Sequence, residues 1–160
     1  MGNYKLELNT IQTWIKQAAD VNSIRLNSGK TKASRPIILF EPPGRGKDRE
    51  LTRYKYVNGI TQYCRLFANN LDEALEIQEA LISDIEDRDS YLDIKDGNGV
   101  KVGRLKNIEV EFTDSDGLDI SFVIRYEVTY SRPVPEAPPS PTFVGNRLII
   151  NENRGEVKDY

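Results

Sequence analysis

Apolar positions along this chain repeat with two periods, one helical and one extended. Near the start of the chain they follow an i, i+3, i+4, i+7 pattern from Ile11, which predicts an amphipathic helix that ends near Asp20. Asn9 or Thr10 is the expected N-cap residue, because a short polar side chain accepts a hydrogen bond from a free N–H group of the first turn.

A second amphipathic helix is predicted over residues 71–88, and Asn69 or Asn70 is its expected N-cap. The apolar stripe of this helix consists of Leu71, Ala74, Leu75, Leu81, Ile82 and Ile85. The opposite face is acidic and begins with Glu73, Glu76 and Glu79. A helix of this kind packs its apolar stripe against a sheet and leaves the acidic face in solvent.

Strict alternation of apolar and polar residues predicts a long β-hairpin in the second half of the chain. Its clearest strand covers residues 118–130, and the expected partner has apolar side chains at alternate positions from Ile108 to Phe112. A turn at residues 113–117 would place Phe112 opposite Leu118, because a slip of one residue would put polar side chains on the apolar face.

The far end of this hairpin is a candidate site of association. Gly103 interrupts the partner strand, and a bend there would separate the two strands before their last residues pair. The overhang of the long strand, which includes Val128 and Tyr130, would then be an open β-edge for a neighbouring chain. If the two strands stay paired, this edge is closed.

The first half of the chain predicts a shorter hairpin. Residues 36–40 form an apolar run typical of a buried strand, and residues 41–50 are a loop by composition, with two prolines, two glycines and six charged side chains. The dipeptide Asn58-Gly59 suits a two-residue hairpin turn, which needs positive φ at both positions, and it would place Tyr54 opposite Tyr63.

Together these elements predict an α+β fold, with a mainly antiparallel mixed sheet of two hairpins packed against two amphipathic helices. The compact domain is expected to cover residues 1–132. Residues 133–141 contain five of the eight prolines, which is typical of a polyproline II spacer, so residues 133–160 are expected to form a proline-rich linker and C-terminal arm. The expected partner-binding residues of the arm are Phe143, Val144, Leu148, Ile149 and Ile150.

Composition removes most catalytic chemistry. The chain has no histidine and a single cysteine, Cys64, so histidine-dependent triads, an internal disulfide and histidine- or cysteine-ligated metal sites are excluded. Its apolar runs are too short to cross a bilayer and its first residues carry no signal-peptide pattern, so we expect a protein made in the cytosol without membrane contact. No catalytic, cofactor-binding or metal-binding residue is predicted.

Two motifs that suggest ligand binding are better explained as turns. Gly29-Lys30-Thr31 is similar to the end of a phosphate-binding loop, but Ile24 stands where the first glycine of that loop is required. The segments at residues 96–99 and 114–119, which are rich in Asp and Gly, lack the glutamate that completes a calcium-binding loop. Asp and Gly are also the ordinary residues of hairpin turns.

Charge is divided unevenly along the chain. The formal net charge of −3 hides a segment from Arg25 to Arg65 with ten basic and three acidic residues, and a segment from Asp72 to Asp96 with ten acidic and two basic residues. One interpretation is two solvated surfaces. Another is head-to-tail contact between copies of the chain, with the basic loop of one copy against the acidic helix of the next. A third interpretation is that the basic segment contacts DNA phosphates.

The order of elements resembles that of the tail terminator, or tail completion, proteins of long-tailed bacteriophages, which are also described as minor capsid or minor tail proteins. The similar parts are the N-terminal helix, residues 35–40 leading into a charged loop, the Asn58-Gly59 hairpin, the acidic helix at 71–88 and the hairpin that ends at residues 125–130. The resemblance implies an α/β fold and a hexameric ring that caps the finished tail tube, ends its polymerisation and offers a surface to the head–tail connector.

The resemblance also implies a virion protein at the head-proximal end of the tail, assembled in the host cytoplasm. Its partners would be further copies of itself, the tail tube protein and the connector or neck protein, with DNA passing through the ring. The candidate subunit-interface or DNA-channel residues are Arg45, Lys47, Arg49, Glu73, Glu76, Glu79, Val128 and Tyr130. A head-side completion or neck adaptor protein is the alternative that the sequence separates least well.

An enzyme is the alternative of another class. Glu109, Glu111 and Glu127 would supply the carboxylates of a hydrolase. All three fall on the polar side of an alternating hairpin, where solvated charge is expected. We therefore do not expect an enzyme.

Overall fold

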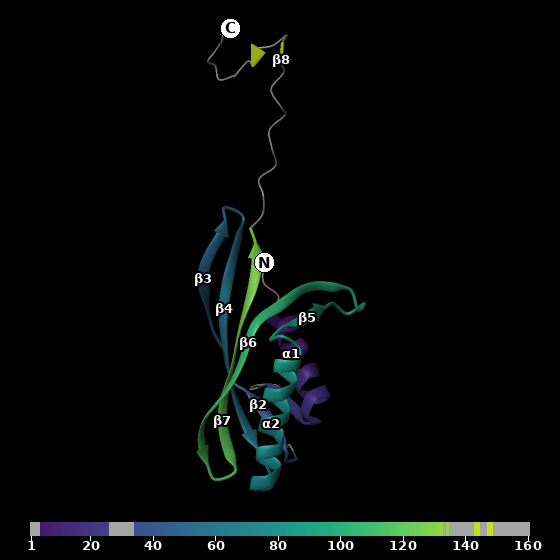
Figure 1. Ribbon diagram of the computed structural model, residues 1–160, viewed down its shortest axis with the longest axis vertical. Coiled ribbons are helices and arrows are strands. Elements are labelled where there is room, and N and C mark those ends of the chain that lie inside the picture. Colours follow the sequence, from purple (N-terminus) through teal and green to yellow (C-terminus); the bar gives the residue numbers. More distant parts are fainter. Residues whose placement is uncertain (1–3, 26–33, 133, 135–142, 145–146, 149–160) are drawn as a thin grey trace.

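The computed structural model describes residues 4–25, 34–132, 134, 143–144 and 147–148 (Figure 1). The elements are α1 (Tyr4–Ala19), β1 (Asn22–Arg25), β2 (Ile37–Phe40), β3 (Gly44–Thr52), β4 (Lys55–Phe67), α2 (Leu71–Asp87), β5 (Leu92–Lys95), β6 (Lys101–Asp116), β7 (Asp119–Ser131), β8 (Phe143–Val144) and β9 (Arg147–Leu148). Within these described ranges, neither helix is long and apolar enough to cross a membrane.

The large sheet has the strand order β1-β2-β4-β7-β6-β5, and β3 pairs with β4 on the same edge as β2. β1 and β2 run parallel, whereas the other neighbours run antiparallel. The two helices lie side by side against one face of this sheet (Figure 1). The predicted α+β fold with a mixed, mainly antiparallel sheet is confirmed.

The core lies between the helices and the facing side of the sheet. Its largest fully buried side chains are Trp14, Tyr126, Phe40, Phe122, Ile11, Ile15, Ile38, Ile60, Leu66, Leu81, Ile85 and Leu105. The alternation predicted for the long strand is confirmed, and its buried members are Ile120, Phe122, Ile124, Tyr126, Val128 and Tyr130. Each of these residues points to the helical side, because side chains on a strand alternate between its faces.

The start of α2 agrees with the prediction, whereas α1 begins earlier than predicted. Asn70 caps α2, since its Oδ1 accepts a hydrogen bond from Glu73 N at 2.8 Å. The N-cap predicted at Asn9 or Thr10 is wrong, because both residues lie well inside α1. The additional first turn brings Glu7 into the core, where it is 1% exposed.

The apolar stripe predicted for α2 is only partly buried. The predicted members that lie in the core are Ala74, Leu81 and Ile85. The predicted members that are exposed are Leu71 (61%), Leu75 (52%) and Ile82 (42%). At 3.6 residues per turn these three fall on one side of the helix, so α2 presents a second apolar stripe to solvent.

The hairpin predicted around Asn58-Gly59 is wrong. β4 continues through both residues, which pair with β3 on one side and with β7 on the other. The chain turns at Arg53-Tyr54 instead, and most of the predicted loop at residues 41–50 is strand β3. Tyr63 pairs with Val123 and does not face Tyr54. Hydrogen bonding on both edges of β4 overrides the local preference of an Asn-Gly pair for a turn.

β6 and β7 form the predicted long hairpin in a different register. Phe112 pairs with Phe122 and not with Leu118, because the turn contains only Gly117 and Leu118. Gly117 supplies the positive φ, 66°, that such a short turn requires. A bulge lies between Phe112 and Asp114. The rings of Phe112 and Phe122 stack, with centroids 4.6 Å apart.

The two strands of this hairpin separate before β7 ends. Pairing of β6 with β7 stops at Lys106 and Glu127, and the remainder of β6 pairs with β5. The bend lies at Asn107, whose φ is 51°, and not at Gly103, which stays paired with Ile94. Among the described residues nothing pairs with the end of β7 on this side, so the predicted open edge is confirmed.

The strands that continue past this point project from the body (Figure 1). We call this part the ribbon: β3, residues 55–61 of β4 and residues 125–131 of β7. The turn at Arg53-Tyr54 is the ribbon tip, and β7 ends beside it, since Arg132 N donates to Tyr54 O at 2.7 Å. The outer edge of β3 is also unpaired in the described part of the chain, so the ribbon has two open edges.

The two short strands near the C-terminus pair with each other. Phe143 is opposite Leu148, and Val144 is opposite Arg147. The predicted spacer at residues 133–141 lies outside the described residues, apart from an exposed Val134. The division into a domain and an arm stays a prediction.

Gly59→Ala tests where the first hairpin turns. Gly59 lies in extended β4, and an added Cβ would meet Asp48 Cβ at an ordinary 3.8 Å, so we expect the free energy of unfolding to stay the same or to rise by up to about 1 kcal/mol. Gly117→Ala is the matched variant, and its φ of +66° predicts a loss of about 1 kcal/mol. Urea unfolding measures the free energy of unfolding of both variants. Equal losses would contradict the extended conformation of Gly59 in β4.

Candidate functional site

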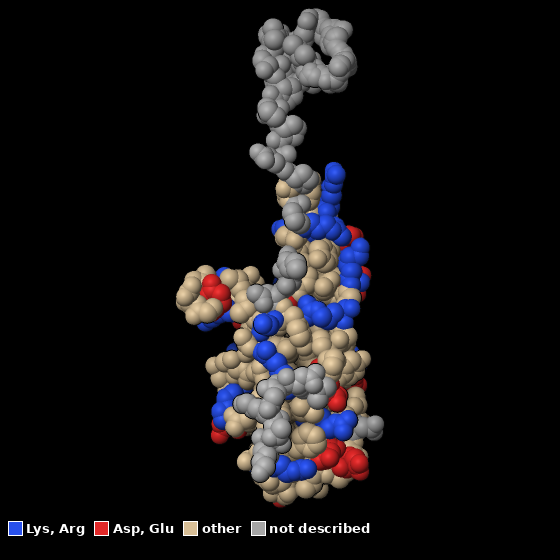
Figure 2. Space-filling model, turned by 180° about the vertical axis from the view of Figure 1, so that it is seen from behind, with Lys and Arg blue, Asp and Glu red and all other residues tan. Residues whose placement is uncertain are grey.

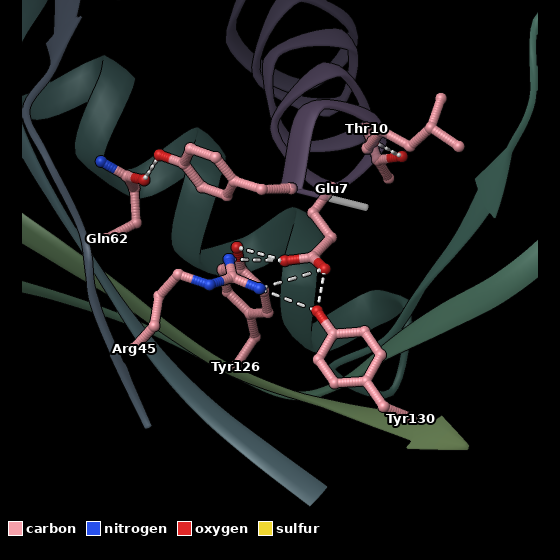
Figure 3. Close-up of polar contacts among 8 residues, drawn as sticks. Glu7, Thr10, Arg45, Gln62, Tyr126 and Tyr130 are labelled. Carbon is pink, nitrogen blue, oxygen red and sulfur yellow. Dashed lines mark hydrogen bonds and ion pairs between the residues drawn. The ribbon is translucent and has the colours of Figure 1, made fainter. Parts of the chain in front are cut away.

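Arg45, the first of the predicted basic contact residues, directs its side chain towards the core and not into solvent. Its side chain is 26% exposed and extends from β3 towards α1 (Figure 3). There it meets Glu7, which the first turn of α1 places in the core. Tyr126 and Tyr130 of β7 complete the group. We call these four residues the Glu7 cluster.

Both oxygens of the Glu7 carboxylate have several donors. Arg45 Nη1 donates to Oε1 at 3.0 Å, and Tyr126 Oη donates to the same oxygen at 3.3 Å. The hydroxyl of Tyr130 donates to Oε2 and accepts from Arg45 Nη2 at 2.8 Å. The Arg45 guanidinium also lies 4.8 Å from the centre of the Tyr4 ring. The cluster therefore satisfies its buried charge and joins α1 to β3 and β7.

The tyrosines of the cluster and the cysteine of the core are in their neutral forms near pH 7. Burial, and next the charge of Glu7, raises the pKa of Tyr126 well above its usual value. Burial and the hydrogen bond to Glu7 do the same to the pKa of Tyr130. Burial raises the pKa of the Cys64 thiol, which lies in the core.

The other two predicted basic residues lie on the outside of the ribbon and have partners in the same chain. Lys47 Nζ donates to Glu50 Oε1 at 2.8 Å, and Arg49 Nη2 donates to Glu127 Oε1 at 3.1 Å. Figure 2 shows basic side chains along the projecting ribbon with acidic ones among them. Three basic residues of the segment 25–65, Arg35, Arg45 and Arg49, are thus paired with acids that the fold brings in from other elements.

Sequence reasoning missed two basic residues at the ribbon tip. Arg53 and Lys55 are exposed, and no carboxylate within the described ranges lies at ion-pair distance from either. The Arg53 guanidinium lies 5.6 Å from the centre of the Tyr54 ring, and Leu51 beside them is 49% exposed. The predicted turn at Asn58-Gly59 places Arg53 and Lys55 within a strand. Their position at the ribbon tip follows only from the turn that the structure shows at Arg53-Tyr54.

The acidic residues of α2 are less compensated than the basic residues of the ribbon. Glu73 Oε1 accepts a hydrogen bond from Asn69 N at 2.8 Å and so belongs to the start of the helix. The exposed carboxylates of α2 that have no cation at ion-pair distance among the described residues are Asp72, Glu76, Glu79, Glu86 and Asp87. α2 therefore carries a net negative surface that the described residues do not neutralise.

Val128 and Tyr130 take part in the open edge of β7 through their backbones. Their side chains are only 4% and 7% exposed and belong to the core. Contact at this edge would therefore use main-chain hydrogen bonds. The predicted arm residues Phe143, Val144 and Leu148 lie in β8 and β9, and Ile149 and Ile150 lie outside the described residues.

The carboxylates of the hydrolase alternative face basic side chains. Glu111 accepts from Arg125 Nη1 at 2.8 Å, Glu109 pairs with Arg125 across the strands, and Glu127 accepts from Arg49. These are the cross-strand charge pairs expected on the solvated side of a hairpin. In the part of the chain that the structure describes, no three His, Cys, Asp or Glu side chains gather as a metal site would require.

Neither a scan of the chain against protein-family models nor a search of curated protein sequences gives a match. What the chain does is therefore inferred from its geometry. The informative features are the projecting ribbon, its two edges that no described strand pairs with, and a helix surface whose negative charge no described cation compensates.

Arg45→Gln tests the Glu7 cluster. It leaves the Glu7 carboxylate buried without its cation, and we expect the free energy of unfolding to fall by about 2–3 kcal/mol. Arg49→Gln makes the same chemical change in the same strand but removes only exposed pairs, so its effect is expected to be much smaller. Denaturant unfolding compares them, and equal losses would contradict the role of the cluster.

Alkaline pH is expected to weaken the fold through Tyr126 and Tyr130. Their pKa values are raised in the folded chain, whereas tyrosine in an unfolded chain titrates at about 10. The stability that they contribute is therefore complete below this pH and is lost as the pH rises above it. The free energy of unfolding, measured from about pH 9 to 11, should fall less steeply in Tyr126→Phe. An unchanged slope would show that this tyrosine is not responsible.

Proposed function

We propose that this chain is the subunit of a closed ring of identical copies, and that the ring caps the tail tube of a long-tailed bacteriophage. In this role it ends polymerisation of the tube and provides the head–tail joining surface. The observation that carries the ring is the ribbon, which projects from the body and has an edge on either side that is unpaired within the described residues. The assignment to the tail rests on the resemblance in the order of elements.

The two edges of the ribbon differ in how they are protected. An open edge presents backbone N–H and C=O groups to any strand that approaches, and natural proteins usually block such edges with charge. β3 carries charged side chains along its length, including Lys47, Asp48 and Arg49. Residues 128–131 of β7 carry none. The β7 edge is therefore the one suited to pairing with another chain.

The geometry of the contact decides between a ring and a simple dimer. Where the ribbon meets a different part of the next copy, each copy gives one contact and receives another. A contact of this kind closes into a ring when its rotation permits. The resemblance implies six copies.

The partners in this role are further copies of the chain, the tail tube protein and the head–tail connector, and DNA passes through the ring. The ring would lie at the head-proximal end of the tail. A head-side completion or neck adaptor ring is the second candidate, since the same ribbon would serve either. A hydrolase is not favoured, because Glu111 and Glu127, two of its three candidate carboxylates, are bonded to arginines.

Native mass spectrometry of the purified full chain, with electron micrographs of the same sample, tests the ring. We expect closed particles, because the ribbon gives each subunit one outgoing contact, and the resemblance implies that each particle has six copies. Incubation with purified tail tubes then separates the two candidates, since a terminator binds at a tube end and a neck adaptor does not. A strict monomer at every concentration would contradict the ring.

A further inference from the structure

We infer that the ribbon tip of one copy docks on the outer face of α2 of the next copy. This rests on the proposed ring and names the side chains of its contact. The docking residues of the tip are Leu51, Arg53, Tyr54 and Lys55. The receiving residues of α2 are the exposed apolar Leu71, Leu75 and Ile82 and the acidic Asp72, Glu76, Glu79 and Glu86.

The outer face of α2 combines an apolar stripe with uncompensated acid. Leu71, Leu75 and Ile82 are between 42% and 61% exposed, although each has the side chain of a core residue. Carboxylates flank this stripe, and within the described chain none of them has a cation at ion-pair distance. The composition of this face is therefore that of an interface, and it suits a partner with apolar and basic side chains.

The ribbon tip has the complementary composition. Arg53 and Lys55 lack a carboxylate partner among the described residues, whereas the other cations of the ribbon are bonded to acids of their own chain. Leu51 is 49% exposed, and the half-buried Tyr54 lies under the Arg53 guanidinium. The tip thus offers an apolar centre with two free positive charges, which suits the apolar and acidic face of α2.

The two surfaces lie in different parts of the molecule. The tip is at the free end of the ribbon, and α2 packs on the body against the helical side of the sheet (Figure 1). A contact between them therefore joins two copies and repeats from each copy to the next. The open edge of β7 ends beside the tip, so both contact features are at the same end of the molecule.

The second exposed apolar region, at the β5–β6 hairpin, is less suited to α2. Val100 and Val102 are 58% and 55% exposed. Two of the cations around them share one carboxylate, because Lys101 and Arg104 lie 3.2 and 3.1 Å from Asp93. Lys95 is exposed and has no ion pair among the described residues, so this hairpin has one uncompensated cation where the ribbon tip has two.

Paired charge reversals in the full chain test the docking. Arg53→Glu with Lys55→Glu reverses the tip, and Glu76→Lys with Glu79→Lys reverses α2. Each pair alone is expected to weaken assembly by about tenfold or more at low salt, and less at high salt, where exposed charges are screened. The chain with all four substitutions is expected to assemble again, since both surfaces are then reversed.

Lys5→Glu with Lys106→Glu is the matched control for the tip. Both lysines are exposed and lie outside the two surfaces, so the net charge changes equally while assembly is expected to stay unchanged. Mass photometry across a concentration and salt series gives the readout, and circular dichroism confirms that each variant is folded. All substituted residues of the two surfaces are exposed, so folding is expected to persist.

The outcomes distinguish the docking from the ring. If rings form normally in both charge-reversed variants, the docking is wrong and the proposed ring still holds. Loss in each pair without recovery in the fourfold variant would also overturn the docking, because the two surfaces would then not face each other. A charge-sensitive dimer or open chain would support the docking and overturn the ring. A wild-type monomer would overturn both.

Discussion

Glu7 is buried at the base of the ribbon and is bonded to residues of two strands that enter it. Arg45 comes from β3 and Tyr130 from β7, so the helix and both outer strands of the ribbon share one network. A buried carboxylate is costly unless its partners are all in place, and removal of any one leaves charge or polar groups unsatisfied. The network therefore fixes the ribbon to the body, and every proposed contact of the ribbon tip depends on that attachment.

The same cluster changes the meaning of the basic half of the sequence. Arg45 forms an ion pair with Glu7, and Lys47 and Arg49 form ion pairs with acids that the fold places beside them. Among the described residues of the ribbon and α2, two cations at the ribbon tip and five exposed carboxylates of α2 have no oppositely charged partner. Charged residues without an oppositely charged partner in the fold indicate an interaction surface more reliably than a local excess of basic or acidic residues in the sequence does.

The parts of the fold that follow one clear period could be predicted from the sequence, and the cluster could not. α2 and β7 bury one regular face each, and both appear close to their predicted limits. β3 is exposed along its whole length, so it has no alternation to reveal it and resembles a loop. The Glu7 cluster joins residues up to 123 positions apart, and a glutamate in the first turn of a helix ordinarily indicates solvent. Only the tertiary fold shows that this one is buried.

Hydroxyl-radical footprinting of the assembled and dissociated chain shows whether the ribbon tip contacts α2 of another copy. This contact predicts that assembly protects Leu51 and Tyr54 together with Leu71, Leu75 and Ile82. Tyr91, Val100 and Val102 are exposed apolar side chains outside both surfaces and serve as internal references, whose oxidation should not change. Protection of the reference residues with continued oxidation of the tip and of α2 would contradict the account.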